Sequence, residues 1–427
     1  MRLHAHIAMA ILLSGGAIGC SDLLEVDMPG SVVEEDLTDP RISETLALSV
    51  EGNTGRAWDQ FILWSTSHSD EWIPTSGNAT NKRRSQRQID KNFTALNSEL
   101  YSPLHVARAE ANEFFERVSS ASETDVPRKT EFLARIRAWG TWPLIAFAET
   151  FCGTPLDGSG VILDSKQLFT LAEAGFTEAI ELAEKAGQTK IKNMALVGRA
   201  RARLGLQNYA GAIADAELVP KGFLFSVSRT AGVSRLMNAQ YVTINGMPNE
   251  SESRKNASVS PPYRDLRWKG VKDPRVTVVA TGTTTYDFWS QHYRHTKINS
   301  EGDDTRLASW EEAQLFIAEA AAMTGDLARA RGILQAFHAS AGIPPVTEVD
   351  IPTQADVIRH VIEERRRVLF AEGGARLRDH LRWRGTDYEI PFKGEPGSYW
   401  PDGKTMSGEL YGDCTCFPIP AAEVLVG

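Results

Sequence analysis

Apolar residues recur at steps of three and four along several long stretches of the chain, a spacing that places them on one face of a helix. This pattern predicts helices over residues 40–64, 100–118, 129–151 and 168–186. The third range contains Pro143, which lacks a backbone N–H and is expected to kink its helix. The first half of the chain is therefore expected to be mainly α-helical.

Two further stretches have the pattern of a tight helical hairpin. Ala195–Leu206 is followed by Asn208 and a second apolar series, and Ala313–Thr324 is followed by Gly325, an aspartate and another apolar series. Glycine can end one helix and Asn or Asp can cap the next. Small alanines at the crossing allow close approach, as in tetratricopeptide repeats. Because Gly205 and Gly325 lie 120 residues apart, the two hairpins do not form a simple tandem array.

Three ranges between these helices lack the helical periodicity. Residues 65–98, 220–305 and 385–415 hold clusters of Ser, Thr, Gly, Asn, Pro and aromatic residues, which are typical of loops. Within the second range, alternating runs indicate short β-strands at Gln240–Ile244 and Val276–Ala280. The predicted fold class is mainly α, with helical hairpins of the tetratricopeptide type forming a scaffold that carries long irregular insertions. Loops on a rigid frame commonly carry binding sites.

The stretch Val357–Trp383 combines an apolar helical stripe with a charged second face. Its charged residues recur at steps of three and four around a Gly-Gly pair: Glu363, Glu364, Arg366, Arg367, Glu372, Arg376, Asp379 and Arg382. Acid–base pairs at this spacing can link adjacent helix turns. Taken alone, the pattern is typical of a solvated, salt-bridged helix face.

The order of residues in this stretch resembles the C-terminal signature of the SusD/RagB family. The signature reads ERR, a short apolar run, EGG, and then Arg376, Asp379, Arg382 and Trp383. The family often has a second acid four residues after the glutamate of ERR, and this chain has Val368 there. Further segments resemble the family: LLEVDMP near the start, ETFCGTPL, HTKINSEGDDTRLASWEEAQLFIAEA and the terminal CFPIPAAEV.

The resemblance implies a single domain over residues 36–427 and a structural role for the signature residues. It also implies a nutrient-binding lipoprotein on the outer face of the bacterial outer membrane. Such a protein would bind a glycan, an oligosaccharide or a peptide and deliver it to a TonB-dependent transporter of the SusC type. It would need no cofactor and would perform no chemistry.

Residues 1–19 have the organisation of an export signal. Arg2 supplies a positive charge, and the apolar run Ile7–Ile18 is too short to cross about 30 Å of hydrocarbon. Small residues then precede Cys20, as in a lipoprotein cleavage box in which Cys20 becomes the lipidated first residue. Ala17 stands where such boxes usually have leucine, so ordinary signal cleavage is the alternative. Residues 20–35 are expected to form a lipidated tether.

Composition and charge are those of a large folded protein. Of the 427 residues 42% are hydrophobic, and a folded chain of this length buries roughly three quarters of its unfolded surface. The 46 Lys and Arg against 55 Asp and Glu give a net charge of −9. Since no basic run is longer than three residues, as at Lys82–Arg84, nucleic acid is not an expected partner.

Three cysteines remain after Cys20, and export would place them where disulfides form. Cys414 and Cys416 are separated by one residue and seldom bridge each other, so the expected bond joins Cys152 to one of them. Cys416 is favoured because it directly precedes the FPIP segment, and Cys414 is the alternative. This bond would tie the C-terminus to the middle of the chain.

The sequence offers little for catalysis or metal binding. It lacks a Gly-rich phosphate loop, a G-x-S-x-G elbow and an H-E-x-x-H motif. The C-x-C pair has no convincing partner for a metal, because the H-x-x-H of His292 and His295 is distant in sequence and weak alone. We therefore expect no metal ion. Paired acids such as Asp70 and Glu71 do not by themselves indicate a glycosidase, whose two carboxylates must be held at a defined separation.

Aromatic side chains in loops are the better candidates for ligand contacts. A flat ring presents a large apolar area at low entropic cost and suits the CH-bearing face of a sugar. The candidates share a position in the irregular ranges: Trp72, Tyr263, Trp268, Tyr286, Trp289, Tyr293, Tyr399 and Trp400. For each of them, packing of the loop against the helices is the competing interpretation.

Two other functions are compatible with the sequence. The first is a periplasmic helical-repeat scaffold that binds proteins, because the hairpins resemble such repeats. The second is a glycoside hydrolase, which would require two carboxylates facing each other in one cleft.

Overall fold

The computed structural model describes residues 39–156, 158, 160–246 and 255–424. The architecture is mainly helical with a few short strands, which confirms the predicted fold class. The predicted export signal, the lipidation site Cys20 and the tether lie outside the described residues and stay predictions. Within the described ranges, none of the helices combines the length and the apolarity that a membrane crossing requires.

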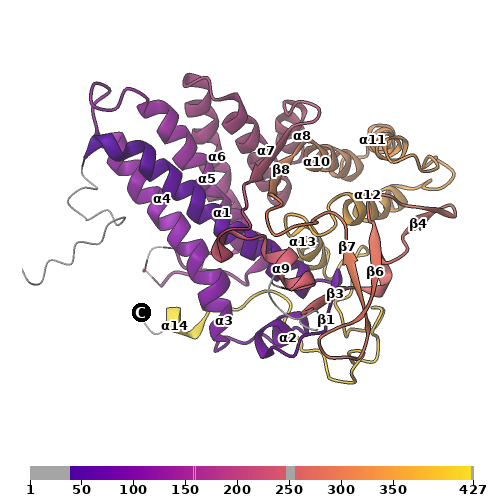
Figure 1. The fold of residues 1–427 in the computed structure, drawn as a ribbon. Helices are drawn as coiled ribbons and strands as arrows, with labels where there is room; N and C mark the ends of the chain where they lie inside the picture. Colours follow the sequence, from indigo (N-terminus) through magenta and orange to yellow (C-terminus); the bar gives the residue numbers. More distant parts are fainter. Residues whose placement is uncertain (1–38, 157, 159, 247–254, 425–427) are drawn as a thin grey trace, which may run out of the picture.

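Four long helices form one side of the scaffold (Figure 1). They are α1 (Ser43–His68), α4 (Ser102–Ser120), α5 (Lys129–Thr150) and α6 (Ser165–Lys185). The central helix is α5, which packs against the other three and buries Trp139 and Trp142. It continues through Pro143 to Thr150. The helices predicted in this half of the chain are therefore present.

Two helical hairpins continue the scaffold, as the sequence predicts. They are α7 (Thr189–Gly205) with α8 (Tyr209–Glu217), and α10 (Trp310–Met323) with α11 (Leu327–Ser340). Side-chain oxygens of Asn208 and Asp326 accept backbone N–H groups of Gly211 and Arg329, and so cap α8 and α11. Because α10 packs against both α7 and α8, the hairpins join despite the long insertion between them.

The hairpin glycines have different roles. Gly325 follows α10 with φ +88°, the left-handed conformation that glycine favours after a helix. In the first hairpin Gln207 takes the positive φ instead, at +59°. A Cβ on Gly205 would lie 2.4 Å from the Phe169 ring, so this glycine is needed for the close packing of α7 on α6.

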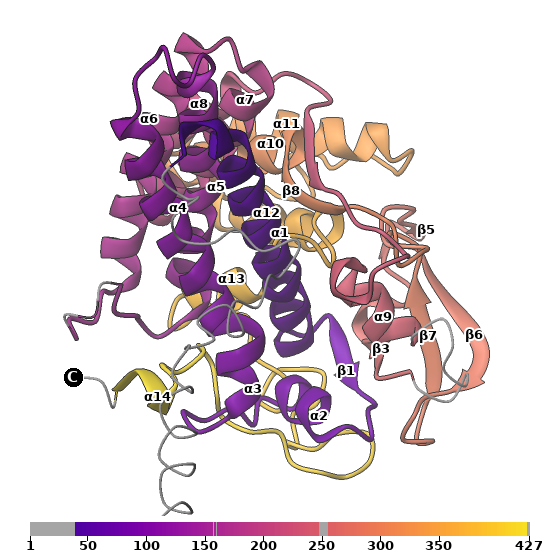
Figure 2. The same cartoon turned by 60° about the vertical axis from the view of Figure 1, so that its left-hand side comes forward.

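The irregular ranges form four small antiparallel sheets of two strands each within the described residues. The pairs are β1 (Trp72–Pro74) with β3 (Ala257–Val259), β2 (Leu224–Val227) with β8 (Thr305–Ser309), β4 (Arg267–Trp268) with β5 (Val271–Lys272), and β6 (Val278–Thr284) with β7 (Gln291–His295). In the first sheet Trp72 is opposite Val259, which joins the first irregular range to the second. Short helices α2 (Ala79–Ser85), α3 (Thr94–Leu96) and α14 (Ala421–Val424) lie below α1 in Figure 2.

One strand prediction is wrong. Gln240–Ile244 lies in the helix α9 (Ala239–Asn245) and not in a strand. The side chain of Asn238 accepts the backbone N–H of Tyr241, and this cap starts a helix where the alternating pattern indicated β-structure. The strand predicted at Val276–Ala280 is present in part as the start of β6.

The C-terminal helices α12 (Gln354–Val368) and α13 (Ala375–Arg382) bury much of the charged face that the pattern alone assigned to solvent. Arg365 and Asp379 are each 1% exposed, and their side chains pair at 2.9 Å. Asp379 also accepts from Arg382 at 2.9 Å, and both arginines bind Glu319 of α10. The signature therefore links α12 and α13 to the hairpin scaffold through buried ion pairs.

A second group of buried charges surrounds Arg201 of α7. Its guanidinium contacts Glu149 of α5 at 2.7 Å and Glu312 of α10 at 3.0 Å. It also donates to the carbonyl of Gly373, in the loop before α13. One side chain thus joins four segments that are far apart in the sequence.

The C-terminal segment returns to the middle of the chain. Cys152 and Cys416 form a disulfide, the pairing favoured from the sequence, and Cys414 is a free thiol. Next to the disulfide, the Phe417 N–H donates to Thr150 O at 2.7 Å, and the Cys152 N–H donates to Phe417 O at 3.0 Å. The Phe417 side chain is fully buried.

Candidate functional site

The most exposed aromatic rings of the predicted set lie in two of the irregular ranges. Trp289, at the turn between β6 and β7, is 66% exposed, and the neighbouring Phe288 is 72% exposed. Tyr399, in the range 385–415, is 60% exposed. The β6–β7 hairpin lies at the edge of the molecule far from α6 (Figure 2). Large rings at such positions can stack on a ligand without moving the scaffold.

Arg264 connects these two regions. Its guanidinium carbon lies 3.9 Å from the centre of the Tyr293 ring, on β7. Burial lowers the pKa of Arg264, and the nearby hydroxyl groups of Tyr293 and Tyr399 oppose that shift. The guanidinium therefore lies over the Tyr293 ring. We call Phe288, Trp289, Tyr293, Tyr399 and Arg264 the aromatic surface.

Sequence reasoning did not find Arg264. Its Nε donates to Val259 O at 2.9 Å, which anchors the side chain. Nothing in the local sequence distinguishes it from the other arginines, because its partners come from β3, β7 and the range 385–415. A guanidinium beside exposed rings can donate to a ligand's hydroxyl or carboxylate oxygens.

Three of the predicted ligand-binding residues are buried. Trp72 is 0% exposed and stacks with His295, and Tyr263 is 0% exposed and donates its hydroxyl proton to Asp70 at 3.0 Å. Trp400 is 7% exposed and packs between the rings of Tyr399 and Tyr411. In this conformation the three rings pack inside the protein, as the competing interpretation of the sequence expected.

The remaining two candidates are partly buried. The Tyr286 ring lies where a Cβ on Gly77 would stand, so it fastens the β6–β7 turn to the first irregular range. Trp268, on β4, packs edge-on against His338 and His360, with ring centres 5.4 Å and 4.8 Å apart. Neither ring belongs to the aromatic surface.

A separate cleft of about 750 Å³ opens between α10, α11 and the segments that flank β8. Its lining includes Lys221, Arg306, Trp310, Gln314, Arg329 and Phe337. Much of its charge is already compensated: Lys297 pairs with Glu372 at 2.8 Å, and Arg329 pairs with Glu217. Trp310 was not among the candidate ligand-binding residues, and this cleft was not predicted.

The acidic pair Asp70 and Glu71 does not face a common cleft. Asp70 accepts from Arg376 and from the Tyr263 hydroxyl, whereas Glu71 is 2% exposed and accepts the Ala371 N–H at 2.7 Å. Both carboxylates thus hold the C-terminal signature region in place. This is a structural use of the pair, and it provides no geometry for a glycosidase.

Comparisons with known proteins agree with this fold. The SusD family model matches residues 230–424. The chain is similar to the crystal structure of a SusD superfamily protein from Bacteroides vulgatus ATCC 8482, with a TM-score of 0.70 at 14% identity, covering 92% of this chain and 98% of that one. A SusD-like carbohydrate binding protein from the same strain has a TM-score of 0.68 at 14% identity, covering 91% and 96%.

A third similar structure is a SusD-like carbohydrate binding protein from Bacteroides fragilis NCTC 9343. It has a TM-score of 0.63 at 15% identity and covers 91% of this chain and 99% of that one. No curated protein sequence matches this chain. The SusD/RagB resemblance predicted from the signature is therefore confirmed by the family model and the shared fold.

Proposed function

We propose that this chain, whose residues 230–424 match the SusD family model, binds an oligosaccharide or glycan and leaves it chemically unchanged. Two proteins that share its fold are described as carbohydrate binding, which supports a sugar ligand over the protein-binding scaffold. The bonds of Asp70 to Arg376 and of Glu71 to the Ala371 N–H occupy both carboxylates and support binding without hydrolysis.

We assign the ligand to the aromatic surface on one observation: the large exposures of Trp289 and Tyr399, 66% and 60%. An aromatic ring left in water gains when it covers the apolar face of a sugar. The hydroxyls of Tyr293 and Tyr399 and the guanidinium of Arg264 can then form hydrogen bonds with the sugar hydroxyls. The 750 Å³ cleft is the competing location, although Lys221 already lies 6.0 Å above its Trp310 ring.

Replacing Trp289 or Tyr399 with alanine is expected to weaken glycan binding about 10- to 100-fold, because each change removes one stacking ring. Binding should be measured by calorimetry after a glycan array has identified a ligand. Because both side chains are exposed, thermal stability should stay unchanged. Chromatography of the recovered glycan should show no cleavage.

Trp310→Ala is the matched control, since it removes a ring from the cleft and leaves the aromatic surface intact. If Trp310→Ala abolished binding while Trp289→Ala and Tyr399→Ala did not, the ligand would belong in the cleft. Turnover of the glycan would refute the non-enzymatic proposal.

We further propose that lipid on Cys20 anchors the protein to the outer face of the outer membrane, where it delivers its ligand to a TonB-dependent transporter of the SusC type. The small residues before Cys20 support lipidation, and the SusD family match supports the outer-membrane location. In intact cells, external protease should then degrade the protein and spare a periplasmic marker. Cys20→Ser should release it from the membrane fraction. Protection from the protease would favour the periplasmic scaffold.

A further inference from the structure

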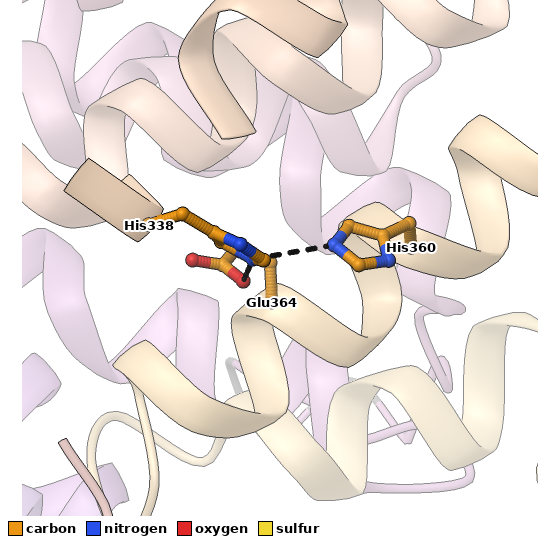
Figure 3. Close-up of side chains that lie close together, drawn as sticks. All are labelled: His338, His360 and Glu364. Carbon is orange, nitrogen blue, oxygen red and sulfur yellow. Dashed lines mark hydrogen bonds and ion pairs between the residues drawn. The ribbon is translucent and has the colours of Figure 1, made fainter. Parts of the chain in front are cut away.

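Two helices bring three potential metal ligands together (Figure 3). His360 and Glu364 are four residues apart on α12, so their side chains leave the same face of that helix. His338 comes from α11 and points toward them. All three residues are buried, and one ligand atom from each lies within 4.8 Å of the others.

Hydrogen bonding decides which nitrogen of His338 is available. Its Nδ1 lies 2.8 Å from the carbonyl oxygen of Pro344, which can only accept a proton, so Nδ1 carries the hydrogen. This leaves Nε2 as the atom that faces the cluster. A histidine that binds a metal through one nitrogen commonly donates from the other to a backbone carbonyl, as here.

The spacing of the three ligand atoms fits a small divalent ion. His338 Nε2 lies 3.2 Å from Glu364 Oε2 and 3.4 Å from His360 Nε2. Ligands about 2.0–2.1 Å from a tetrahedral zinc ion stand roughly 3.3 Å from one another. Both separations therefore match edges of such a tetrahedron. Two histidines and one glutamate form a common ligand set for zinc.

Neighbouring residues hold the ligands in position. One nitrogen of the Arg275 guanidinium donates to Oε1 of Glu364, and this bond leaves Oε2 facing the histidines. The second guanidinium nitrogen also lies 3.4 Å from Oε2. Asp273 pairs with Arg275 at 2.7 Å and with Arg367 at 3.0 Å, so the nearby cationic charge is partly compensated. The Trp268 ring packs edge-on against both histidines and restricts their movement.

We propose that His338, His360 and Glu364 bind a zinc ion that joins α11 to α12. Three protein ligands leave a fourth coordination position for water. The ion would stabilise the packing of α11 on α12, away from the aromatic surface. This site is independent of the glycan-binding proposal.

The test uses the mature chain, stripped with a chelator and re-equilibrated with zinc chloride. After gel filtration, mass spectrometry of the metal should find about one zinc per chain. At a zinc concentration 100 times the dissociation constant, the unfolding equilibrium should shift about 100-fold toward the native state. His338→Gln and His360→Gln should each weaken zinc binding by at least about 10-fold.

Two matched variants should retain the zinc. His105→Gln changes another mostly buried histidine, which contacts Thr154 instead of the cluster. Cys414→Ser removes the free thiol, which is a potential zinc ligand outside the cluster. Both should bind zinc as the parent protein does.

A measurement on the unmodified chain covers the case in which the glutamine variants fail to fold. Cobalt in place of zinc should give the visible bands of a tetrahedral ion, and nitrogen NMR should show His338 Nε2 without a proton. The proposal is overturned if the parent chain retains no zinc or if His360→Gln binds it equally well. It is also overturned if His338 keeps protons on both nitrogens in excess zinc, because the cluster would then be a histidine–glutamate ion pair.

Discussion

Replacing Arg201 with methionine is expected to lower the free energy of unfolding by about 3–5 kcal/mol. The Arg201 side chain is fully buried, and its guanidinium pairs with Glu149 and Glu312 and donates to Gly373 O. Methionine fills similar space but leaves Glu312 without this cation, and Glu149 retains only Arg378 at 3.3 Å. An uncompensated buried charge is far more costly than the loss of an exposed pair. Urea denaturation at neutral pH measures the difference.

Arg117→Met is the matched control for this change. Arg117 pairs with Glu113 one turn away on α4, where the two side chains are 28% and 52% exposed. Its loss should cost less than about 1 kcal/mol. If the two substitutions had equal effects, the ion pairs around Arg201 would not contribute to holding the scaffold together.

Glu71→Gln is expected to stabilise the protein above pH 7 by about 3 kcal/mol and to change little at pH 4.5. Burial raises the pKa of Glu71 to about 7 from its ordinary 4.5. Between these two values the unfolded chain releases the proton while the folded chain keeps it, so the stability of the parent protein falls as pH rises through this window. A shift of this size corresponds to about 3 kcal/mol. Glutamine has no charge to bury and removes the penalty.

The hydrogen bonds of Glu71 suit this substitution. Glutamine can still accept the Ala371 N–H through its oxygen, and its amide can donate to Ser69 Oγ, whose own proton is accepted by Thr66 O at 3.1 Å. Burial also lowers the pKa of Lys393 to about 7, but that group changes the stability between about pH 7 and 10.5 and leaves the acidic window undisturbed.

Glu319→Gln should act with the opposite sign. Burial alone would raise the pKa of Glu319, but its ion pairs with Arg382 and Arg365 hold that pKa below the ordinary value. The neutral amide should therefore destabilise the protein at neutral pH. Urea denaturation of both variants and the parent protein at pH 4.5, 6 and 8 measures these differences in the free energy of unfolding. A Glu71→Gln curve that parallels the parent at every pH would show that Glu71 is ionised in the folded chain.

The sequence predicted the scaffold well because its signals are local. The caps at Asn208 and Asp326, the apolar stripes and the signature after Val357 each lie within one or two helices. The burial of Arg365 was not predictable in this way. Its partner Glu319 lies 46 residues away, and only the packing of α12 against α10 brings them together.

The candidate site was less predictable for the same reason. Trp72 and Trp289 both occur in loop-like sequence, yet one is buried by β3 and β7 and the other is exposed at a turn. The His338, His360 and Glu364 cluster depends on the crossing of α11 over α12. A histidine followed by a glutamate four positions later is too common to indicate a metal site alone.

The bond between Cys152 and Cys416 constrains the order of events during synthesis. The two cysteines are 264 positions apart, so the Cys416 thiol leaves the ribosome only after the whole segment between them has been made. The disulfide can close only after residue 416 has been made, and Phe417 can then take its place beside Thr150. A chain truncated before residue 416 could not form the disulfide that ties the C-terminal segment to the end of α5.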